Sequence, residues 1–377
     1  MKLALEPAEQ LLQEDVRAFL ATHAPDASEI PHALDDRMAF LREWQARCYE
    51  AGFVGRAWPA EFGGGGRPTS EQIVVDQELA AAGAPEFPSV VRLDVLGPAI
   101  LAFGTDEQRA RYVRPILAAE ELWAQGFSEP EAGSDLASLR TTAVETDEGW
   151  VLNGQKTWIS WGQFARWCGV LARTDPELPK HKGISLLVVD MASPGLEVRP
   201  MEQITGHAEF CELFLDDVVV PSENMLGGRG DGWKIAMHVV GHERGTAALP
   251  RQVMLRTWLD RLVADAAAAG VLADERAQDE LARALIEIEV LRHHASRTMA
   301  AFLNGGAVGP ESSGVKLLMA QAEQTLCATA LDVLGDAGAG PFWHERYLYS
   351  RAASVYGGTQ QIQRDIIANR ILSLPAE

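Results

Sequence analysis

The sequence predicts a multidomain α+β protein with a helical segment, then an all-β module, then a second helical segment. Apolar residues recur at helical spacing over residues 1–118, alternate with polar residues from Trp123 to about Pro221, and return to helical spacing from Gly232. We therefore expect an N-terminal helical domain at 1–118, a central β-barrel or β-sandwich domain at 119–228, and a C-terminal four-helix bundle at 229–377.

The first segment is expected to form several helices, because apolar residues such as Leu12 and Val16 recur at helical spacing. Gly52 is placed to end one of them, since glycine readily adopts the left-handed backbone that follows a helix. Thr105 and Gln108 have the spacing of a capping box, which predicts the start of another helix.

The central module contains a predicted hairpin whose acidic turn is Asp147–Gly149. Its strands would bring the stretch Trp123–Asp135 back toward the stretch Asn153–Ser160. Together these stretches offer small hydroxyl side chains and one large aromatic, Trp158, which suits a planar heterocycle bound at its edge and covered on one face. For either stretch alone, an ordinary hairpin with a structural tryptophan is an equally good interpretation. The hydroxyls are those of Ser128, Ser134 and Ser160.

The C-terminal segment is again helical by its spacing, with glycine and asparagine marking the helix ends. A last helix is expected after Gly357-Gly-Thr359, because isoleucines then recur on one face. The three longer helices are expected at about 232–268, 274–303 and 312–335.

Composition excludes several classes of function. The formal net charge of −20 argues against a nucleic-acid partner, which would need a basic face. No apolar run approaches the roughly 20 residues that span a bilayer, and the N-terminus shows no secretory signal. The four cysteines are widely spaced, which is typical of reduced thiols in a cytoplasmic protein. His293 and His294 have no neighbouring ligand set, so no metal site is expected.

Three motifs, in this order, resemble the acyl-CoA dehydrogenase family. They are the stretch Trp123–Asp135, the run Gly-Gln-Lys-Thr-Trp-Ile-Ser at 154–160, and the run Tyr-Gly-Gly-Thr-Gln-Gln-Ile-Gln-Arg at 356–364. The resemblance covers nearly the whole chain, and three separated motifs are far more specific than one. It implies an N-terminal α-domain, a central β-domain and a C-terminal four-helix domain, the order that the hydrophobic periodicity predicts independently.

The resemblance implies FAD as cofactor and an acyl-CoA thioester as substrate, oxidised to the trans-2-enoyl form. By motif position, Ser128 would hydrogen-bond the pyrimidine edge of the flavin, Ser160 would lie at its N5 region, and Trp158 would flank the ring. Ser134 would lie near the CoA chain. The motifs also imply Phe127, Gly133, Ile159, Thr359 and Gln361 as cofactor residues and Tyr356 as a substrate residue. Thr359 is equally suited to cap its own helix.

The reaction needs a base for the α-proton, and a carboxylate can serve if burial raises its pKa. In many family members a glutamate directly follows the tyrosine of the last motif, but here that position is Gly357. Other members carry the base in a Glu-Arg pair on the first C-terminal helix, where this chain has Glu243 and Arg244. We expect Glu243 to take the α-proton, Arg244 to contact the CoA or its surroundings, and the Gly357 N–H to donate to the thioester oxygen. A glutamate alone on a helix is more often a solvated surface residue, and that alternative stays open.

Two departures from the family pattern indicate a partner subunit. Many members have an Arg-x-x-Phe-Gly run and a Gln-x-x-Gly-Gly-x-Gly motif, both of which reach the FAD of a neighbouring subunit. Here the first is missing around Arg251, and Asp332 and Asp336 replace residues of the second, where carboxylates would repel a pyrophosphate. The pattern is similar to actinobacterial steroid side-chain-degrading enzymes, which are α2β2 tetramers of two different subunits. We expect the catalytic subunit of such a tetramer, with a homotetramer as the alternative.

Three functions remain open at this point. The first is an acyl-CoA dehydrogenase that passes electrons to an electron-transfer flavoprotein. The second is an acyl dehydrogenase linked to a carrier protein, or an oxygen-using flavoenzyme on the same fold. The third is a non-catalytic subunit of a hetero-oligomer, which would follow if Glu243 were not a base. A base on the earlier helix is associated in the family with branched or bulky acyl groups.

Overall fold

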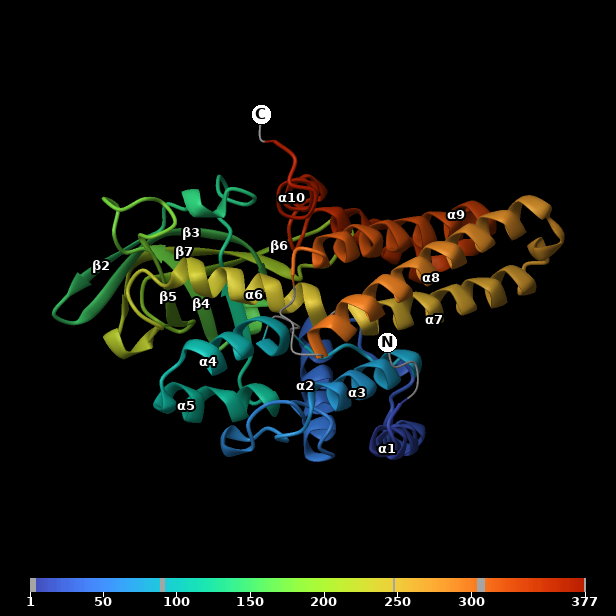
Figure 1. Cartoon of the computed structure of the whole chain (residues 1–377), viewed down its shortest axis with the longest axis horizontal. Coiled ribbons are helices and arrows are strands. Elements are labelled where there is room, and N and C mark those ends of the chain that lie inside the picture. Colours follow the sequence, from blue (N-terminus) through green and yellow to red (C-terminus); the bar gives the residue numbers. More distant parts are fainter. Residues whose placement is uncertain (1–4, 89–91, 247, 304–308, 376–377) are drawn as a thin grey trace. The chain divides into compact units, whose positions relative to one another are not determined.

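The computed structural model describes residues 5–88, 92–246, 248–303 and 309–375 of the chain (Figure 1). The chain forms two compact units, and each combines segments that lie far apart in the sequence. One unit comprises Met1–Ala27, Thr69–Pro85 and Glu243–Glu377, and the other comprises Ser28–Pro68 and Glu86–His242. The first is entirely helical in its described part and is here called the helical unit; the second contains the sheet and is called the sheet unit.

The sheet unit begins with helices whose ends follow from local chemistry. Gly52 has a left-handed backbone (φ 78°) just beyond the second helix, as its position predicts. Thr105 caps the fifth helix, because its Oγ1 accepts the N–H of Gln108 at 3.2 Å while its own N–H donates to the Gln108 side chain at 3.0 Å. The predicted capping box is therefore confirmed. The helices of this unit are α2 (Leu34–Glu50), α4 (Gly97–Phe103), α5 (Asp106–Leu117) and the start of α6 (Gly232–Thr246).

An eight-stranded sheet forms the core of this unit, and its strands pair in the order β6-β7-β3-β2-β4-β5-β8, with β1 against β4. Most neighbours are antiparallel, whereas β1 runs parallel to β4. Leu152, Leu187 and Leu213 are among the buried residues that form its apolar core, and each such burial contributes about 1.5–3 kcal/mol. The strands are β1 (Trp123–Gly126), β2 (Thr142–Thr146), β3 (Gly149–Ser160), β4 (Trp167–Arg173), β5 (Ile184–Asp190), β6 (Leu196–Met201), β7 (Phe210–Val220) and β8 (Met225–Leu226).

The predicted hairpin is present, with Thr146 paired to Gly149 at its closed end. Gly149 has φ 122°, and a Cβ at this position would lie 2.4 Å from the carbonyl oxygen of Val220. Only glycine fits here, because both the backbone angle and the close approach of β7 exclude a side chain. The hairpin therefore returns β3 alongside the segment that follows β1.

The helical unit is built on three long helices that pack side by side along their lengths (Figure 1). Leu262, Ile288 and Leu326 are fully buried between them, one from each helix. The short helix α10 begins at Gln360, directly after Thr359, as the isoleucine spacing predicts. The helices of this unit are α1 (Pro7–His23), α3 (Thr69–Ala81), α7 (Ala248–Ala268), α8 (Glu275–Leu303), α9 (Ser312–Ser350) and α10 (Gln360–Ile366).

The predicted end of a helix at Gly335 is only partly right. The backbone leaves the helical conformation at Gly335 (φ 69°, ψ 164°) and again at Gly340 (φ 65°, ψ 177°), but helix resumes at Pro341 and runs to Ser350. A glycine followed by a proline indicates a break, and proline also fits the first turn of a new helix.

The expected single helix at 232–268 is present as α6 and α7, on either side of residue 247, which lies outside the described residues.

The fold class predicted from the sequence is confirmed in its order of helices, sheet and helices. None of the described helices is long and apolar enough to cross a membrane. Within the described ranges, no cluster of three or more histidine, cysteine or acidic side chains could hold a metal ion.

Candidate functional site

The segment after β1 is fixed to β3 by a buried lysine. Lys156 is fully buried, and its Nζ donates to Glu129 Oε1 at 2.8 Å and to the carbonyl oxygen of Phe127 at 3.2 Å. Beside it, the N–H of Thr157 donates to the carbonyl oxygen of Ser128 at 3.0 Å. The two stretches that the sequence predicts to come together are therefore joined by three hydrogen bonds.

The carboxylate of Glu129 is fully engaged in this network. It also accepts the backbone N–H groups of Arg140 at 2.6 Å and Thr141 at 2.8 Å. Burial acts to raise the pKa of Glu129, but the charge of Lys156 and these hydrogen bonds outweigh it, so the pKa lies below its usual value. Burial lowers the pKa of Lys156 to about 8, although Glu129 opposes that shift. The pair is thus a hydrogen-bonded buried ion pair.

This ion pair is not among the site residues predicted from the sequence. A signal was present, because Lys156 lies in the inward-facing register of β3 with Trp150 and Leu152. A lysine at an inward position of a strand must find a charged partner, since an unpaired buried charge is very costly. The sequence could therefore have indicated a buried acidic partner, but not which residue supplies it.

Trp158 is presented to the surface by a β-bulge. The pairing of β3 with β7 shifts by one residue between Lys156, opposite Leu213, and Ile159, opposite Cys211. Within the bulge Trp158 adopts a left-handed backbone (φ 60°), and it remains 63% exposed. A large aromatic side chain in this conformation is unusual and marks a position that its surroundings must hold.

The residues around Trp158 differ in how far they are buried. Ile159 is fully buried in the sheet core, so any contact with a cofactor would come from its backbone. The ring of Phe210 lies 6.1 Å from that of Trp158 at an interplanar angle of 79°. Phe127 is also buried, at 5% exposure. The exposed aromatic surface at this point is therefore mainly the indole of Trp158.

The hydroxyls named by the sequence analysis are available to a ligand. Within the described ranges, the side-chain oxygens of Ser128, Ser134 and Ser160 have no hydrogen-bond partner in the chain, and all three residues are at least partly exposed. A Cβ at the exposed residue Gly133 would meet nothing within 4 Å, so the backbone beside Ser134 is open. Unpaired hydroxyls and an uncovered indole fit the edge and the face of a flavin ring.

In the helical unit, a buried lysine supports the segment around Gly357. Lys316 is 6% exposed, its Nζ donates to the carbonyl oxygen of Ala353 at 2.8 Å, and it lies 4.2 Å from the ring centroid of Tyr356. Gly357 and Gly358 both have left-handed backbones, with φ 63° and 95°. The side chain of Lys316 therefore supports the segment around Tyr356 and Gly357, which the family resemblance assigns to the substrate.

The turn then enters α10 through two further side chains. The buried amide of Gln363 donates to the carbonyl oxygens of Gly357 at 3.3 Å and Gly358 at 3.2 Å. Thr359 Oγ1 accepts the N–H of Ile362 at 3.3 Å, so Thr359 caps the helix. Gln361 is exposed. A role of Thr359 and Gln361 at FAD stays a prediction.

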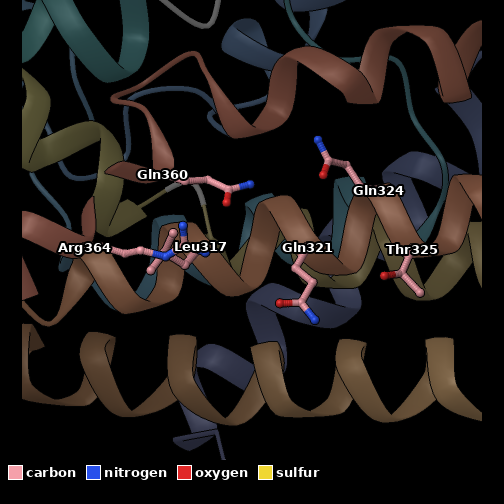
Figure 2. A pocket seen from close by; sticks show the side chains of 6 residues that line it. All are labelled: Leu317, Gln321, Gln324, Thr325, Gln360 and Arg364. Carbon is pink, nitrogen blue, oxygen red and sulfur yellow. The ribbon is translucent and has the colours of Figure 1, made fainter. Parts of the chain in front are cut away.

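A small polar pocket lies between α9 and the start of α10, with a volume of about 240 Å³ (Figure 2). This is below the roughly 300–1,000 Å³ of typical ligand sites, so it could hold only part of a large ligand. This pocket is not predicted from the sequence, because its residues come from two helices that are separate in the chain. Its lining residues are Leu317, Gln321, Gln324, Thr325, Gln360 and Arg364.

Two features of the helical unit bear on the remaining expectations. Glu243 and Arg244 lie in α6, but their side chains are outside the described residues, and so is the side chain of Asp336.

Arg251 forms an ion pair with the buried carboxylate of Glu323, with Nη2–O distances of 2.8 and 2.9 Å. The Arg251 guanidinium is therefore paired with a carboxylate of the same helical unit.

Known proteins match this chain in the order of helical, sheet and helical segments described above. Family models match as the N-terminal domain at 6–120, the middle domain at 124–218 and the C-terminal domain at 230–372, all of acyl-CoA dehydrogenase. Acyl-CoA dehydrogenase IpdE1 of Mycobacterium tuberculosis is 41% identical over 344 residues, which cover 89% of this chain and 88% of that protein. The chain belongs to the acyl-CoA dehydrogenase family. It is accordingly an oxidoreductase that dehydrogenates acyl-CoA thioesters, in a family of FAD-dependent flavoproteins.

Solved structures of this family match the whole chain. A steroid acyl-CoA dehydrogenase described as Tcur3481-Tcur3483 has a TM-score of 0.88 at 28% identity and covers 100% of both chains. The ChsE4-ChsE5 complex from Mycobacterium tuberculosis has a TM-score of 0.85 at 29% identity, again with 100% of both chains covered. Both structures are described by the names of two proteins. The resemblance inferred from the three motifs is therefore confirmed.

Proposed function

We propose that this acyl-CoA dehydrogenase converts an acyl-CoA to its trans-2-enoyl thioester, with Glu243 as the base for the α-proton. FAD, when bound, would accept the hydride from Cβ. The single observation that carries the FAD assignment is the exposed indole of Trp158 on its bulge, next to the unpaired hydroxyls of Ser128 and Ser160. Ser134 is assigned to the CoA chain.

In the helical unit, the roles concern the thioester. Removing the α-proton builds negative charge on the thioester oxygen, so a hydrogen-bond donor there lowers the barrier. We assign the donor to the backbone N–H of Gly357, because Lys316 and Gln363 hold this turn in a defined conformation. Arg244 and Tyr356 are assigned to the substrate, and Thr359 and Gln361 to FAD. Electron-transfer flavoprotein is the proposed acceptor, and the expected location is the cytoplasm.

The experiment that tests the base is anaerobic bleaching of bound FAD by a panel of acyl-CoA thioesters. Wild type should bleach, whereas Glu243→Gln should bind FAD and substrate but bleach at least about 10²-fold more slowly, since general bases typically contribute 10²–10⁴-fold. Glu275→Gln removes an exposed carboxylate of the same unit and should behave as wild type. Equal bleaching by the wild type and Glu243→Gln would show that the base lies elsewhere.

We also propose that the working enzyme is an α2β2 tetramer with a second acyl-CoA dehydrogenase-like subunit. Arg251 is tied to Glu323, and Asp332 is exposed with its carboxylate near Arg276, so neither offers a cationic site for a neighbour's pyrophosphate. The names of the two matching structures, each of which joins two proteins, support the same proposal. The description of the first as a steroid acyl-CoA dehydrogenase favours a bulky or steroid-derived acyl group. A chain that is purified alone as an active, FAD-saturated homotetramer would contradict the proposal.

A carrier-bound thioester or oxygen as acceptor remains the alternative within this reaction class. Comparing acyl-CoA with carrier-bound thioesters, with and without oxygen, distinguishes them. Turnover that requires electron-transfer flavoprotein and CoA thioesters supports the proposal.

A further inference from the structure

We propose that Lys156 and Glu129 are positioning residues for the flavin: their buried ion pair holds the Ser128 segment and the Trp158 bulge in the arrangement that receives the isoalloxazine ring. The inference rests on the proposed FAD site and adds to it two residues that contact neither flavin nor substrate.

The pair joins three separate segments of the sheet unit. Lys156 belongs to β3, Glu129 and Phe127 follow β1, and the Glu129 carboxylate accepts the N–H groups of Arg140 and Thr141 ahead of β2. The two charged side chains themselves are buried, with Lys156 at 0% and Glu129 at 8% exposure. The pair therefore sets the position of the loop that carries Ser128 relative to the strand that carries Trp158.

Stability alone does not account for such a pair. Removing two charges from water costs several kcal/mol per ion, and apolar residues of similar volume are often equally stabilising at such positions. A buried pair held by several hydrogen bonds does, however, specify geometry, because each bond has a preferred length and direction. The benefit of Lys156 is then the fixed position of the Phe127–Glu129 carbonyls and carboxylate rather than net folding energy.

The bulge needs this support. Trp158 has φ 60°, a conformation that costs a tryptophan of order 1–3 kcal/mol and persists only where neighbouring contacts impose it. On its N-terminal side the chain is fixed by Lys156 and by the N–H of Thr157 on the Ser128 carbonyl; on the other side Ile159 is buried. Without the ion pair, the N-terminal side of the bulge keeps only the bond between Thr157 and Ser128, and both Trp158 and Ser128 are less firmly held.

The test compares the assembled protein carrying Lys156→Met with wild type and with Arg251→Met. Methionine keeps the length of the lysine stem and removes its charge. Arg251→Met breaks a partly buried ion pair of the helical unit, in which the Glu323 carboxylate is buried, and so reports the general effect of such a loss. FAD affinity is measured by titrating FAD-depleted protein with FAD, and the flavin environment by visible circular dichroism; thermal unfolding of the FAD-free proteins is measured in parallel.

We expect Lys156→Met to bind FAD at least tenfold more weakly than wild type, with an altered dichroism of the bound flavin. Arg251→Met should unfold at a lower temperature but keep wild-type affinity and dichroism. Should Lys156→Met fail to fold, Glu129→Gln, which preserves shape, replaces it with the same expected result.

Wild-type affinity and dichroism in Lys156→Met would overturn this inference alone. An equal loss of affinity in Arg251→Met would also overturn it, because the effect would then be one of stability. A wild-type assembly that binds no FAD would overturn the proposed function and this inference together.

Discussion

Replacing Trp158 by alanine is expected to cost little folding stability but much FAD affinity. Trp158 is 63% exposed, so about a third of its surface is covered by the protein. An aromatic side chain of this size buries up to about 250 Å² when fully enclosed. A third of that area, at roughly 25 cal/mol per Å², corresponds to about 2 kcal/mol, part of which alanine retains. The expected loss is thus about 1–2 kcal/mol in free energy of unfolding.

Two further variants test the reasoning. Trp158→Gly also relieves the left-handed backbone strain, which costs about 1–2 kcal/mol. Glycine gives back about 0.5–1 kcal/mol of this through the entropy of the unfolded chain. It should therefore equal or exceed the alanine variant in stability. Trp44 is buried at 1% exposure in α2 of the same unit, and Trp44→Ala should cost about 3–5 kcal/mol.

The assay is denaturant unfolding of the FAD-free protein together with FAD titration. Both Trp158 variants should bind FAD about two- to tenfold more weakly, since stacking on an aromatic ring contributes about 0.5–1.5 kcal/mol. A cost for Trp158→Ala as large as that of Trp44→Ala would refute the reading of Trp158 as an exposed residue kept for a ligand. Unchanged FAD affinity would show that the indole covers something else.

Two predictions concern the helical unit. Burial raises the pKa of Asp76 from 3.8 to about 6, although a hydrogen bond from Gln72 opposes the shift. The folded state therefore binds more protons than the unfolded state in this interval, and stability should fall by up to about 3 kcal/mol as pH rises from 4 to 6. Asp76→Asn should raise the unfolding temperature at pH 7.5 but not at pH 4; an equal effect at both values would contradict the assignment. Lys316→Met should raise KM for acyl-CoA while leaving FAD content unchanged, because it frees the Ala353 carbonyl and the Tyr356 ring beneath Gly357. Lost FAD with unchanged KM would place Lys316 at the cofactor instead.

Much of the architecture was predictable because it depends on local periodicity. The alternation on either side of Asp147–Gly149 predicts a hairpin, and β2 and β3 form it. The spacing of Thr105 and Gln108 predicts a helix start, which both hydrogen bonds confirm. These signals act over a few residues, so they survive without knowledge of the rest of the fold.

The break in α9 shows where such local signals end. Gly335 correctly indicates a departure from helix, but the sequence predicts no helix between this glycine and the last motif, where the structure has helix again up to Ser350. Whether a chain resumes its helix after a break depends on an apolar face that packs elsewhere. Trp343, at 1% exposure in the core of the bundle, provides that face.

The sequence by itself determined the order of domains, the family motifs and the residue types at the candidate site. Only the tertiary structure decided that Lys156 pairs with Glu129, which lies 27 positions earlier, and that a bulge turns Trp158 outward while Ile159 points into the core. Strand register and buried charge pairing arise from contacts between distant segments, and a one-residue shift in register reverses which face a side chain occupies. No local pattern in the sequence carries that information.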